Sequence, residues 1–240
     1  MFAHANTTLN LDRVSFSNNS ISNNSFGAAL GSEGTGATFN ISNSTFDNND
    51  NSATSAGGGA FVLTGNKTTT ISNSVFTNNN ARLGGAFKVV SSASLILTDS
   101  TFSNNSTDSG STTNSRQGGA IMSESTGQIT IQNSLFSGNS TNGTTSLGGA
   151  IWLQGSFTSV ILNNNTFSGN SSLTGGAVYI NDTGAGTAAQ ITNNTFTGNT
   201  ATTDDDLRLV SLHTGSLVQN NIIESELSAD TAITVDHNYY

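Results

Sequence analysis

Apolar and polar residues alternate over short stretches along almost the whole chain. Such stretches include Phe39–Ile41 and Ile129–Ile131, and Asn, Gly or Ser lies within three residues of each end. Alternation with a period of two predicts β-strands, and no window of useful length has the period of an amphipathic helix. The pattern therefore predicts an all-β protein built from many short strands that are separated by bends.

Two short motifs recur along the chain and alternate with each other. The first, Phe-x-x-Asn, occurs at Phe16–Asn19, Phe46–Asn49, Phe76–Asn79, Phe102–Asn105, Phe136–Asn139, Phe167–Asn170 and Phe196–Asn199. The second, Gly-Gly-Ala followed by an apolar residue, occurs at Gly58–Phe61, Gly84–Phe87, Gly118–Ile121, Gly148–Ile151 and Gly175–Val178. A degenerate copy lies at Gly27–Leu30, and the aligned segment Asp204–Leu207 has lost the glycines.

A repeat of roughly 30 residues is too small to bury its own apolar side chains, whereas stacked repeats bury a continuous core. Crossovers between parallel strands are right-handed. We therefore predict a single-stranded, right-handed parallel β-helix, a solenoid of about seven to eight coils. It forms one domain over residues 1–240, with a lead-in over 1–8, regular coils over 9–210 and irregular terminal coils over 211–240.

Each motif position has a physical role in such a stack. The Phe side chains are expected inside, ring upon ring. The motif Asn is expected at a bend, where Asn tolerates unusual dihedral angles, with its amide bonding coil to coil. The paired glycines allow a tight corner. Connections of variable length leave one corner, and the longest, Ser106–Gln117, is expected to be mobile.

Alternation also predicts which side chains point outward. The residues directly after each glycine motif and two positions later are mostly apolar and are expected to face the core. The residues between them then face outward: Val62, Lys88, Met122, Trp152, Tyr179 and Arg208. We expect Met122, Trp152 and Tyr179 to form an exposed stripe that contacts sugars or a protein partner. Scattered surface hydrophobic residues are the alternative interpretation.

The strand before each Phe motif also has an outward column, and ice binding is a further possible function of this column. Thr70-x-Ser72 and Ile96-x-Thr98 are faint hints of the flat, regular Thr array that such a protein needs. The pattern breaks in adjacent coils, so ice binding stays the least favoured alternative.

Charge and composition exclude several classes of function. The net charge is −9, and the six basic residues are spread along the chain, which argues against nucleic acid and against an anionic membrane surface. No apolar run is long enough to cross a bilayer. There is no cysteine, so disulfides and thiol chemistry are excluded. The start of the chain shows no signal peptide, as expected if the signal was removed or the segment excised.

No convincing catalytic constellation is present, so we expect a protein that is not an enzyme. The acidic residues are scattered except for Asp204-Asp205-Asp206, with Arg208 and His213 nearby. These carboxylates are a weak candidate for Ca²⁺, which prefers oxygen ligands, and a solvated turn is the favoured interpretation. Consecutive strand residues point to opposite faces and would not converge. We expect no other cofactor and no confident metal site.

The interleaved Phe-x-x-Asn and Gly-Gly-Ala-Ile/Val motifs over residues 9–210 resemble the passenger repeats of chlamydial polymorphic outer-membrane proteins and related bacterial surface β-helices. This resemblance implies a non-catalytic extracellular or cell-surface bacterial protein that serves adhesion or self-assembly. Its partners would be further copies stacked end to end, a host or cell-surface protein, or a glycan. A carbohydrate-binding or polysaccharide-degrading β-helix is the alternative.

Overall fold

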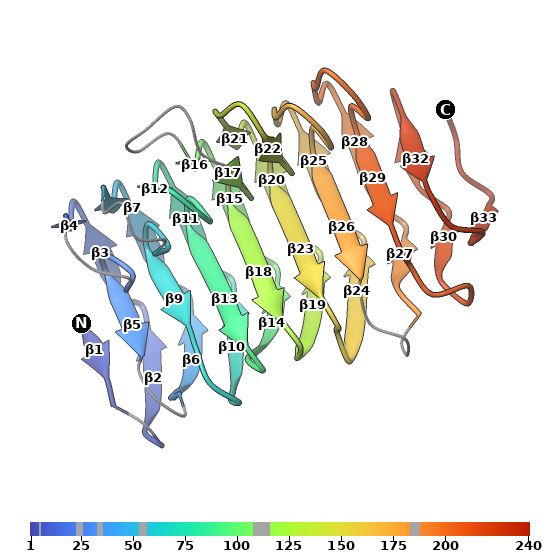
Figure 1. Ribbon diagram of the computed structural model, residues 1–240. Coiled ribbons are helices and arrows are strands. Elements are labelled where there is room, and N and C mark those ends of the chain that lie inside the picture. Colours follow the sequence, from blue (N-terminus) through green and yellow to red (C-terminus); the bar gives the residue numbers. More distant parts are fainter. Residues whose placement is uncertain (5, 23–25, 33–35, 53–56, 108–115, 183–187) are drawn as a thin grey trace.

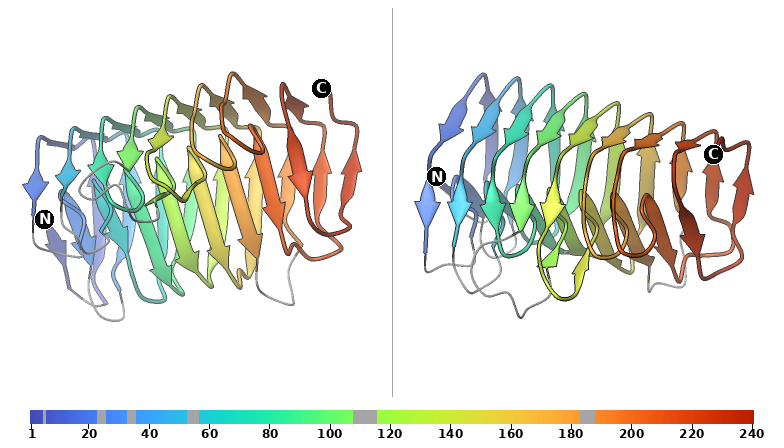
Figure 2. Two further views of the ribbon diagram at one scale, coloured as in Figure 1. Left: turned by 45° about the horizontal axis from the view of Figure 1, so that its top comes forward. Right: turned by 90° about the horizontal axis from the view of Figure 1, so that it is seen from above.

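The computed structural model describes the chain except for residues 5, 23–25, 33–35, 53–56, 108–115 and 183–187. Throughout the described part the chain winds as a parallel β-helix, and each strand pairs in parallel with its counterpart one coil away. Figures 1 and 2 show the coils stacked from the N-terminal end to the C-terminal end of a rod. The predicted fold class is confirmed.

Three long sheets run the length of the rod. Sheet A contains β1 (Phe2–Ala3), β5 (Leu30–Ser32), β9 (Phe61–Leu63), β13 (Phe87–Ser91), β18 (Ile121–Ser125), β23 (Ile151–Gly155), β26 (Val178–Asp182), β29 (Leu207–Val210) and β32 (Leu227–Ala229). Sheet B contains β2 (Thr8–Asp12), β6 (Thr38–Ser42), β10 (Thr68–Ser72), β14 (Ser94–Thr98), β19 (Gln128–Gln132), β24 (Ser159–Asn163), β27 (Gln190–Thr192), β30 (Leu217–Gln219) and β33 (Thr234–Asp236). Sheet C contains β3 (Ser15–Ser17), β7 (Thr45–Asp47), β11 (Val75–Thr77), β15 (Thr101–Ser103), β20 (Leu135–Ser137), β25 (Thr166–Ser168), β28 (Thr195–Thr197) and β31 (Ile222–Ile223).

Two smaller sheets lie between sheet C and the next strand of sheet A. Sheet D contains β4 (Ser20–Ile21), β8 (Asp50–Asn51), β12 (Asn80–Ala81), β16 (Ser106–Thr107) and β21 (Ser140–Thr141). Sheet E contains β17 (Arg116–Gln117) and β22 (Ser146–Leu147), and single bridges extend its register to Leu83, Thr174 and Thr203. Most of the long connection Ser106–Gln117 lies outside the described residues.

The terminal segment 211–240 continues the stack with β30, β31, β32 and β33, which pair with strands of the preceding coil. These strands bring sheets A and B to nine strands each, so the number of coils differs slightly from the predicted seven to eight. The coils there are shorter, and Asn221 and Asn238, equivalent positions of successive coils, are 17 residues apart.

The Phe side chains of the motif form one stack inside the rod, as predicted. Successive rings from Phe16 to Phe196 lie 4.6 to 5.1 Å apart between centroids and within 18° of parallel. The six rings from Phe46 onward are completely buried, whereas Phe16 in the first coil is partly exposed. Stacked aromatic contact adds to the burial of apolar area along the core.

The motif Asn side chains form a continuous hydrogen-bonded ladder, as predicted. The amide Nδ2 of each Asn donates to Oδ1 of the next, as from Asn105 to Asn139 at 2.9 Å, and the backbone N–H donates to the same oxygen at 3.0 Å. The Nδ2 also donates to the carbonyl of the Phe one coil back, as from Asn139 to Phe102 at 3.0 Å. Every polar atom of a buried amide thus has a partner, which removes the cost of burying it.

A second ladder, which the sequence reasoning missed, lies at the corner between sheets B and C. Its members are Ser44, Ser74, Ser100, Ser134, Asn165, Asn194, Asn221 and Asn238. The backbone N–H of each donates to the side-chain oxygen of the next at 2.9 to 3.2 Å. The signal was the Ser or Asn two positions before every motif Phe from Phe46 onward.

The unusual backbone angles belong to the residue before each ladder residue, so the prediction that placed them on the motif Asn was wrong. Asn48 and Asn78 have φ of 52° and 55°, and Gly138 takes the same position in a later coil. At the other corner Asn43 and Asn73 precede the second ladder with φ of 51° and 46°. The left-handed residue turns the chain, and its neighbour then points inward to bond along the rod.

The second glycine of each pair is required by close packing between coils. A Cβ on Gly119 would lie 2.1 Å from the carbonyl oxygen of Gly149 and 2.6 Å from the backbone nitrogen of Ser140. The first glycine has a left-handed conformation in four of the five pairs, as at Gly118 with φ of 61°, and a Cβ there would lie 2.0 Å from the carbonyl oxygen of Ile121. Asp204 keeps that conformation with φ of 58° where the glycines are lost.

Candidate functional site

The outer face of sheet A carries the residues that the sequence analysis singled out. Lys88, Met122, Trp152, Tyr179 and Arg208 are paired in register from strand to strand, with Val62 before them and Ser228 after them. We call this row the outer column. From β9 to β29 the residues on either side of it in each strand, such as Ile151 and Leu153, are buried, whereas Leu227 and Ala229 of β32 are not. The predicted alternation is therefore correct.

The predicted exposure of the stripe is wrong. Val62 is 3% exposed, Met122 is 0% exposed and Trp152 is 3% exposed, although none of the three belongs to the main core cluster. Large side chains that pair in register lie about 5 Å apart and cover one another. The segments directly before the glycine pairs also pair with one another from coil to coil, as Arg116–Gln117 does with Ser146–Leu147. Lys88, Tyr179 and Arg208 are half-buried.

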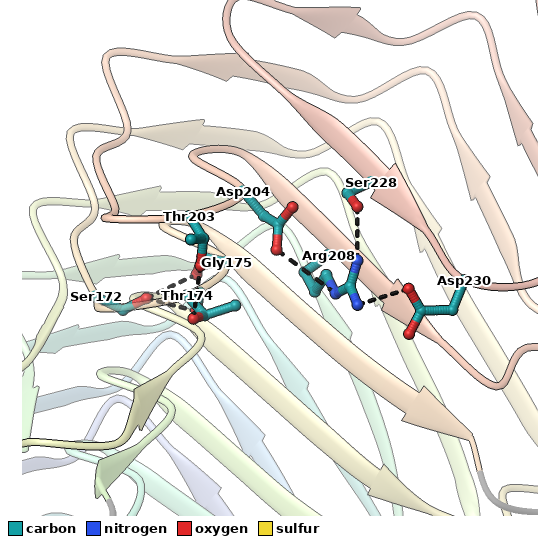
Figure 3. Close-up of polar contacts among 8 residues, drawn as sticks. All are labelled: Ser172, Thr174, Gly175, Thr203, Asp204, Arg208, Ser228 and Asp230. Atoms are coloured by element: carbon teal, nitrogen blue, oxygen red, sulfur yellow. Dashed lines mark hydrogen bonds and ion pairs between the residues drawn. The ribbon is translucent and has the colours of Figure 1, made fainter.

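A network of charged and hydroxyl groups surrounds Arg208 at the C-terminal end of the outer column (Figure 3). Its guanidinium donates to Asp230 Oδ1 and to Ser228 Oγ, each at 2.6 Å, and its Nε lies 3.5 Å from Asp204 Oδ2. Residues from two successive coils are thus joined on the outer face. Thr174 and Thr203 share a hydrogen bond of 2.9 Å nearby, and Ser172 donates to the carbonyls of Thr174 and Gly175.

The three carboxylates considered for Ca²⁺ have three different protein partners. Asp204 pairs with Arg208, Asp205 accepts a hydrogen bond from the backbone N–H of Ala201 at 2.7 Å, and Asp206 is fully buried. In the described residues no group of three His, Cys, Asp or Glu side chains could hold a metal ion. The structure therefore does not bring these acids together.

Asp206 closes the ladder of motif Asn side chains. Its Oδ1 accepts a hydrogen bond from Asn199 Nδ2 at 2.9 Å, and its Oδ2 accepts one from the backbone N–H of Ser225 at 2.8 Å. Burial raises the pKa of this carboxyl above its usual range, although the two hydrogen bonds oppose the shift. Asp206 thus links the last regular coil to the short terminal coils, a role that the sequence did not suggest.

Burial also shifts two titratable groups of the outer column. It lowers the pKa of Lys88, with the Glu124 carboxylate opposing the shift, and it raises the pKa of Tyr179. In both cases partial removal from water disfavours the charged form. The Tyr179 phenol is therefore neutral at physiological pH, which suits it to hydrogen bonding and ring contact.

The outward columns of sheet B do not form a flat Thr array. Thr70 and Ile96 are paired in register, but Ile96 is half-buried and Thr130, the next residue in that row, is buried. An open hollow of about 290 Å³ lies elsewhere, at the N-terminal end of the rod, where Met1, Ala3 and Leu9 are among its lining residues. No residue of the outer column lines it.

Comparison with known proteins gives one match. Residues 12–223 match the family model of the right-handed β-helix region. Because the match covers most of the chain, the protein belongs to the right-handed β-helix family, in agreement with the parallel stack described above. Neither the curated proteins nor the solved structures that were searched include a match to this chain. Among the described residues, no helix has the length and apolar character needed to span a membrane.

Proposed function

We propose that this chain is a non-catalytic extracellular or cell-surface protein whose rigid rod presents the outer face of sheet A for adhesion. The observation that supports the proposal is that all three carboxylates of the acidic cluster are bonded within the protein. Asp204, Asp205 and Asp206 are bonded to Arg208, to the backbone and to the Asn ladder. Carboxylates held in this way stabilise the coil and are not arranged as a catalytic pair.

The two internal ladders support the same role. A buried row of fully bonded amides and a stack of Phe rings fix each coil on the next, so the side chains on the outer faces are held in a fixed register. Binding faces are most precise when rigid elements position them. The resemblance to bacterial surface β-helix passengers adds the expectation of a bacterial, surface-exposed location.

End-to-end self-assembly is the alternative to adhesion by single rods. Light scattering of the intact chain at increasing concentration separates the two functions. Reversible filament growth on concentration would favour stacking, whereas a size that is independent of concentration would favour adhesion.

The test of the proposed function is a binding assay with the intact chain on beads. Saturable attachment to whole cells or to immobilised cell-surface glycans and matrix proteins is expected, with beads bearing an unrelated acidic protein as the control. Attachment no stronger than that of the control beads would refute adhesion. Turnover of any polysaccharide in a degradation panel, abolished by Asp205→Ala, would show an enzyme and refute the proposal in a different way.

A further inference from the structure

The loop that joins β21 to β22 contains the one Asn-Gly sequence of the chain, at Asn142 and Gly143. It lies at the corner of the rod where the chain passes from sheet D to sheet E (Figure 1). The Asn142 side chain is exposed, and Thr144 and Thr145 beside it are exposed as well. Gly143 has no Cβ that would shield its backbone nitrogen or restrict its dihedral angles. The carboxamide of Asn142 can therefore approach that nitrogen.

The two groups that would react with each other carry no hydrogen bond to any described residue. The Asn142 carboxamide has no partner, and neither does the backbone N–H of Gly143. The bond that Gly143 does make uses its carbonyl, which accepts from Ser146 Oγ at 3.1 Å. That bond leaves the Gly143 nitrogen available.

The Asn-Ser sequence three residues earlier in the same coil is held in the opposite way. Asn139 is fully buried, and its Nδ2 donates to the Phe102 carbonyl and to Asn170 Oδ1, each at 3.0 Å. The backbone N–H of Ser140 donates to the Asn105 carbonyl at 2.9 Å. Both the carboxamide and the nitrogen that would attack it are therefore already bonded within the ladder.

We propose that Asn142 is a site of spontaneous covalent modification, in which its side chain cyclises with the backbone of Gly143. The Gly143 nitrogen attacks Asn142 Cγ, a new N–Cγ bond closes a succinimide ring, and the Cγ–Nδ2 bond breaks. Nδ2 leaves as ammonia and takes the proton of the Gly143 amide. Water then opens the ring at either carbonyl, which gives aspartate or isoaspartate. Asn side chains are among the thermolabile groups of proteins, and water is the only co-reactant required.

The modification changes the surface of the rod and leaves its interior alone. Asn142 belongs to neither internal ladder and lies outside the strands. A carboxylate in its place adds one negative charge to a chain whose net charge is already −9. The isoaspartyl product also lengthens the loop backbone by one carbon atom. The site is therefore a chemical mark of the age of the protein, and it is independent of the proposed adhesive function.

Ageing of the intact folded chain in warm, mildly alkaline buffer tests the proposal, with a parallel sample unfolded in guanidinium chloride. Peptide mass spectrometry follows the conversion of each Asn. At Asn142 the folded chain is expected to convert within about threefold of the unfolded rate, as for a segment that needs no opening. At Asn139 the folded chain is expected to convert at least about tenfold more slowly than the unfolded one, because buried hydrogen bonds must first break.

Comparing each site with its own unfolded rate removes the intrinsic difference between Asn-Gly and Asn-Ser sequences. An isoaspartate-specific methyltransferase should label the aged protein. Asn142→Gln should lose most of that label, since the longer side chain has to close a larger ring. Aged chains separated by charge should keep the β-sheet circular-dichroism spectrum and the unfolding temperature of fresh protein.

Four results would overturn the proposal. Asn142 stays an amide in the folded chain while it converts in guanidinium chloride, or folding protects Asn139 no more than Asn142. The other two are an isoaspartate label that persists in Asn142→Gln, which places the reaction elsewhere, and a modified fraction that has unfolded, which makes the loop part of the stack.

Discussion

The side-chain amide of Asn199 donates to a buried carboxylate oxygen of Asp206 at 2.9 Å, and this bond ends a ladder that begins at Asn19. The other oxygen of Asp206 accepts the backbone N–H of Ser225. Asp206 differs from an Asn only in its terminal group. It nevertheless ends the Asn ladder and links a regular coil to the short terminal coil that follows. In the next coil Ile223 pairs with Phe196, and the residue three positions later is Glu226, so no Asn continues the ladder there.

The pH dependence of stability should carry the signature of Asp206. Its folded pKa is raised, so the folded protein binds the proton more tightly than the unfolded chain does. Its contribution to stability is then fully present below the unfolded pKa of 3.8 and is lost as the pH rises through the folded pKa. Asp206→Asn removes this titration. Thermal unfolding from pH 3.5 upward should show that the unmodified protein loses stability relative to Asp206→Asn as the pH rises.

Glu226→Gln, an exposed substitution in the same short coil, serves as the control for this experiment. It removes one negative charge without touching the ladder, so its stability difference from the unmodified protein should change much less with pH. If both variants show the same pH profile, the effect comes from net charge and the assignment to Asp206 is incorrect.

Breaking the Asn ladder at its centre should be costly. Asn139→Ala removes the acceptor of Asn105 and a donor to both Asn170 and the Phe102 carbonyl, all of them buried. Each unpaired buried group costs about 1–3 kcal/mol, so a loss of about 3–6 kcal/mol in the free energy of unfolding is expected from urea titration. Asn40→Ala, which loses one exposed hydrogen bond, should lose less than about 1 kcal/mol. Equal losses would show that the ladder contributes little beyond surface amides.

Two glycines of different character predict different outcomes for the same substitution. Gly119→Ala places a Cβ 2.1 Å from a backbone oxygen of the next coil, which cannot yield without separating the coils. We expect this variant to be insoluble or to lose its β-sheet circular-dichroism spectrum. At Gly169, with φ of 63°, an added Cβ meets nothing within 4 Å. Gly169→Ala should fold and lose only about 1–2 kcal/mol, the cost of a left-handed alanine. A soluble, native-like Gly119→Ala would contradict the close approach of the coils.

The position of a ring in the Phe stack should determine the cost of its removal. Phe136 is completely buried between Phe102 and Phe167, whereas Phe16 is partly exposed and, among the described rings, contacts only Phe46. Phe136→Ala should lower the free energy of unfolding by about 3–5 kcal/mol, as for other large buried side chains. Phe16→Ala should lose clearly less, measured by urea unfolding under the same conditions. A larger loss for Phe16→Ala would mean that the first coil nucleates the fold.

Sequence spacing was sufficient to predict the fold because each repeated position has a single physical task. The motif Phe, the motif Asn and the paired glycines recur at intervals that stack them one above another, and alternation correctly placed Ile151 and Leu153 inside. The second ladder was missed because it mixes Ser and Asn, as at Ser134 and Asn165, so no single letter repeats. Both residues supply a side-chain oxygen at the same position in the coil, and the backbone N–H of the preceding coil needs only such an acceptor.

The candidate site was only half predictable for a different reason. Alternation fixes the direction of a side chain relative to its sheet, and it placed Trp152 and Tyr179 on the outer face correctly. It says nothing about what neighbouring coils place over that side chain, so the burial of Met122 and Trp152 was not foreseen. Nor can spacing reveal that Trp152 Nε1 and Asn181 Oδ1 lack partners, since that depends on the exact positions of atoms.

Every amide-to-amide bond of the Asn ladder runs the same way, with one hydrogen of each Nδ2 directed toward the C-terminal end of the rod. The amide dipoles therefore add along the axis instead of cancelling, as peptide dipoles do in an α-helix. The positive pole of the Asn ladder lies at Asn199, and the carboxyl group of Asp206 is bonded to it. A solenoid whose described residues form no helix has thus acquired a polar axis, and it carries an acid at the end where hydrogen-bond donors face it.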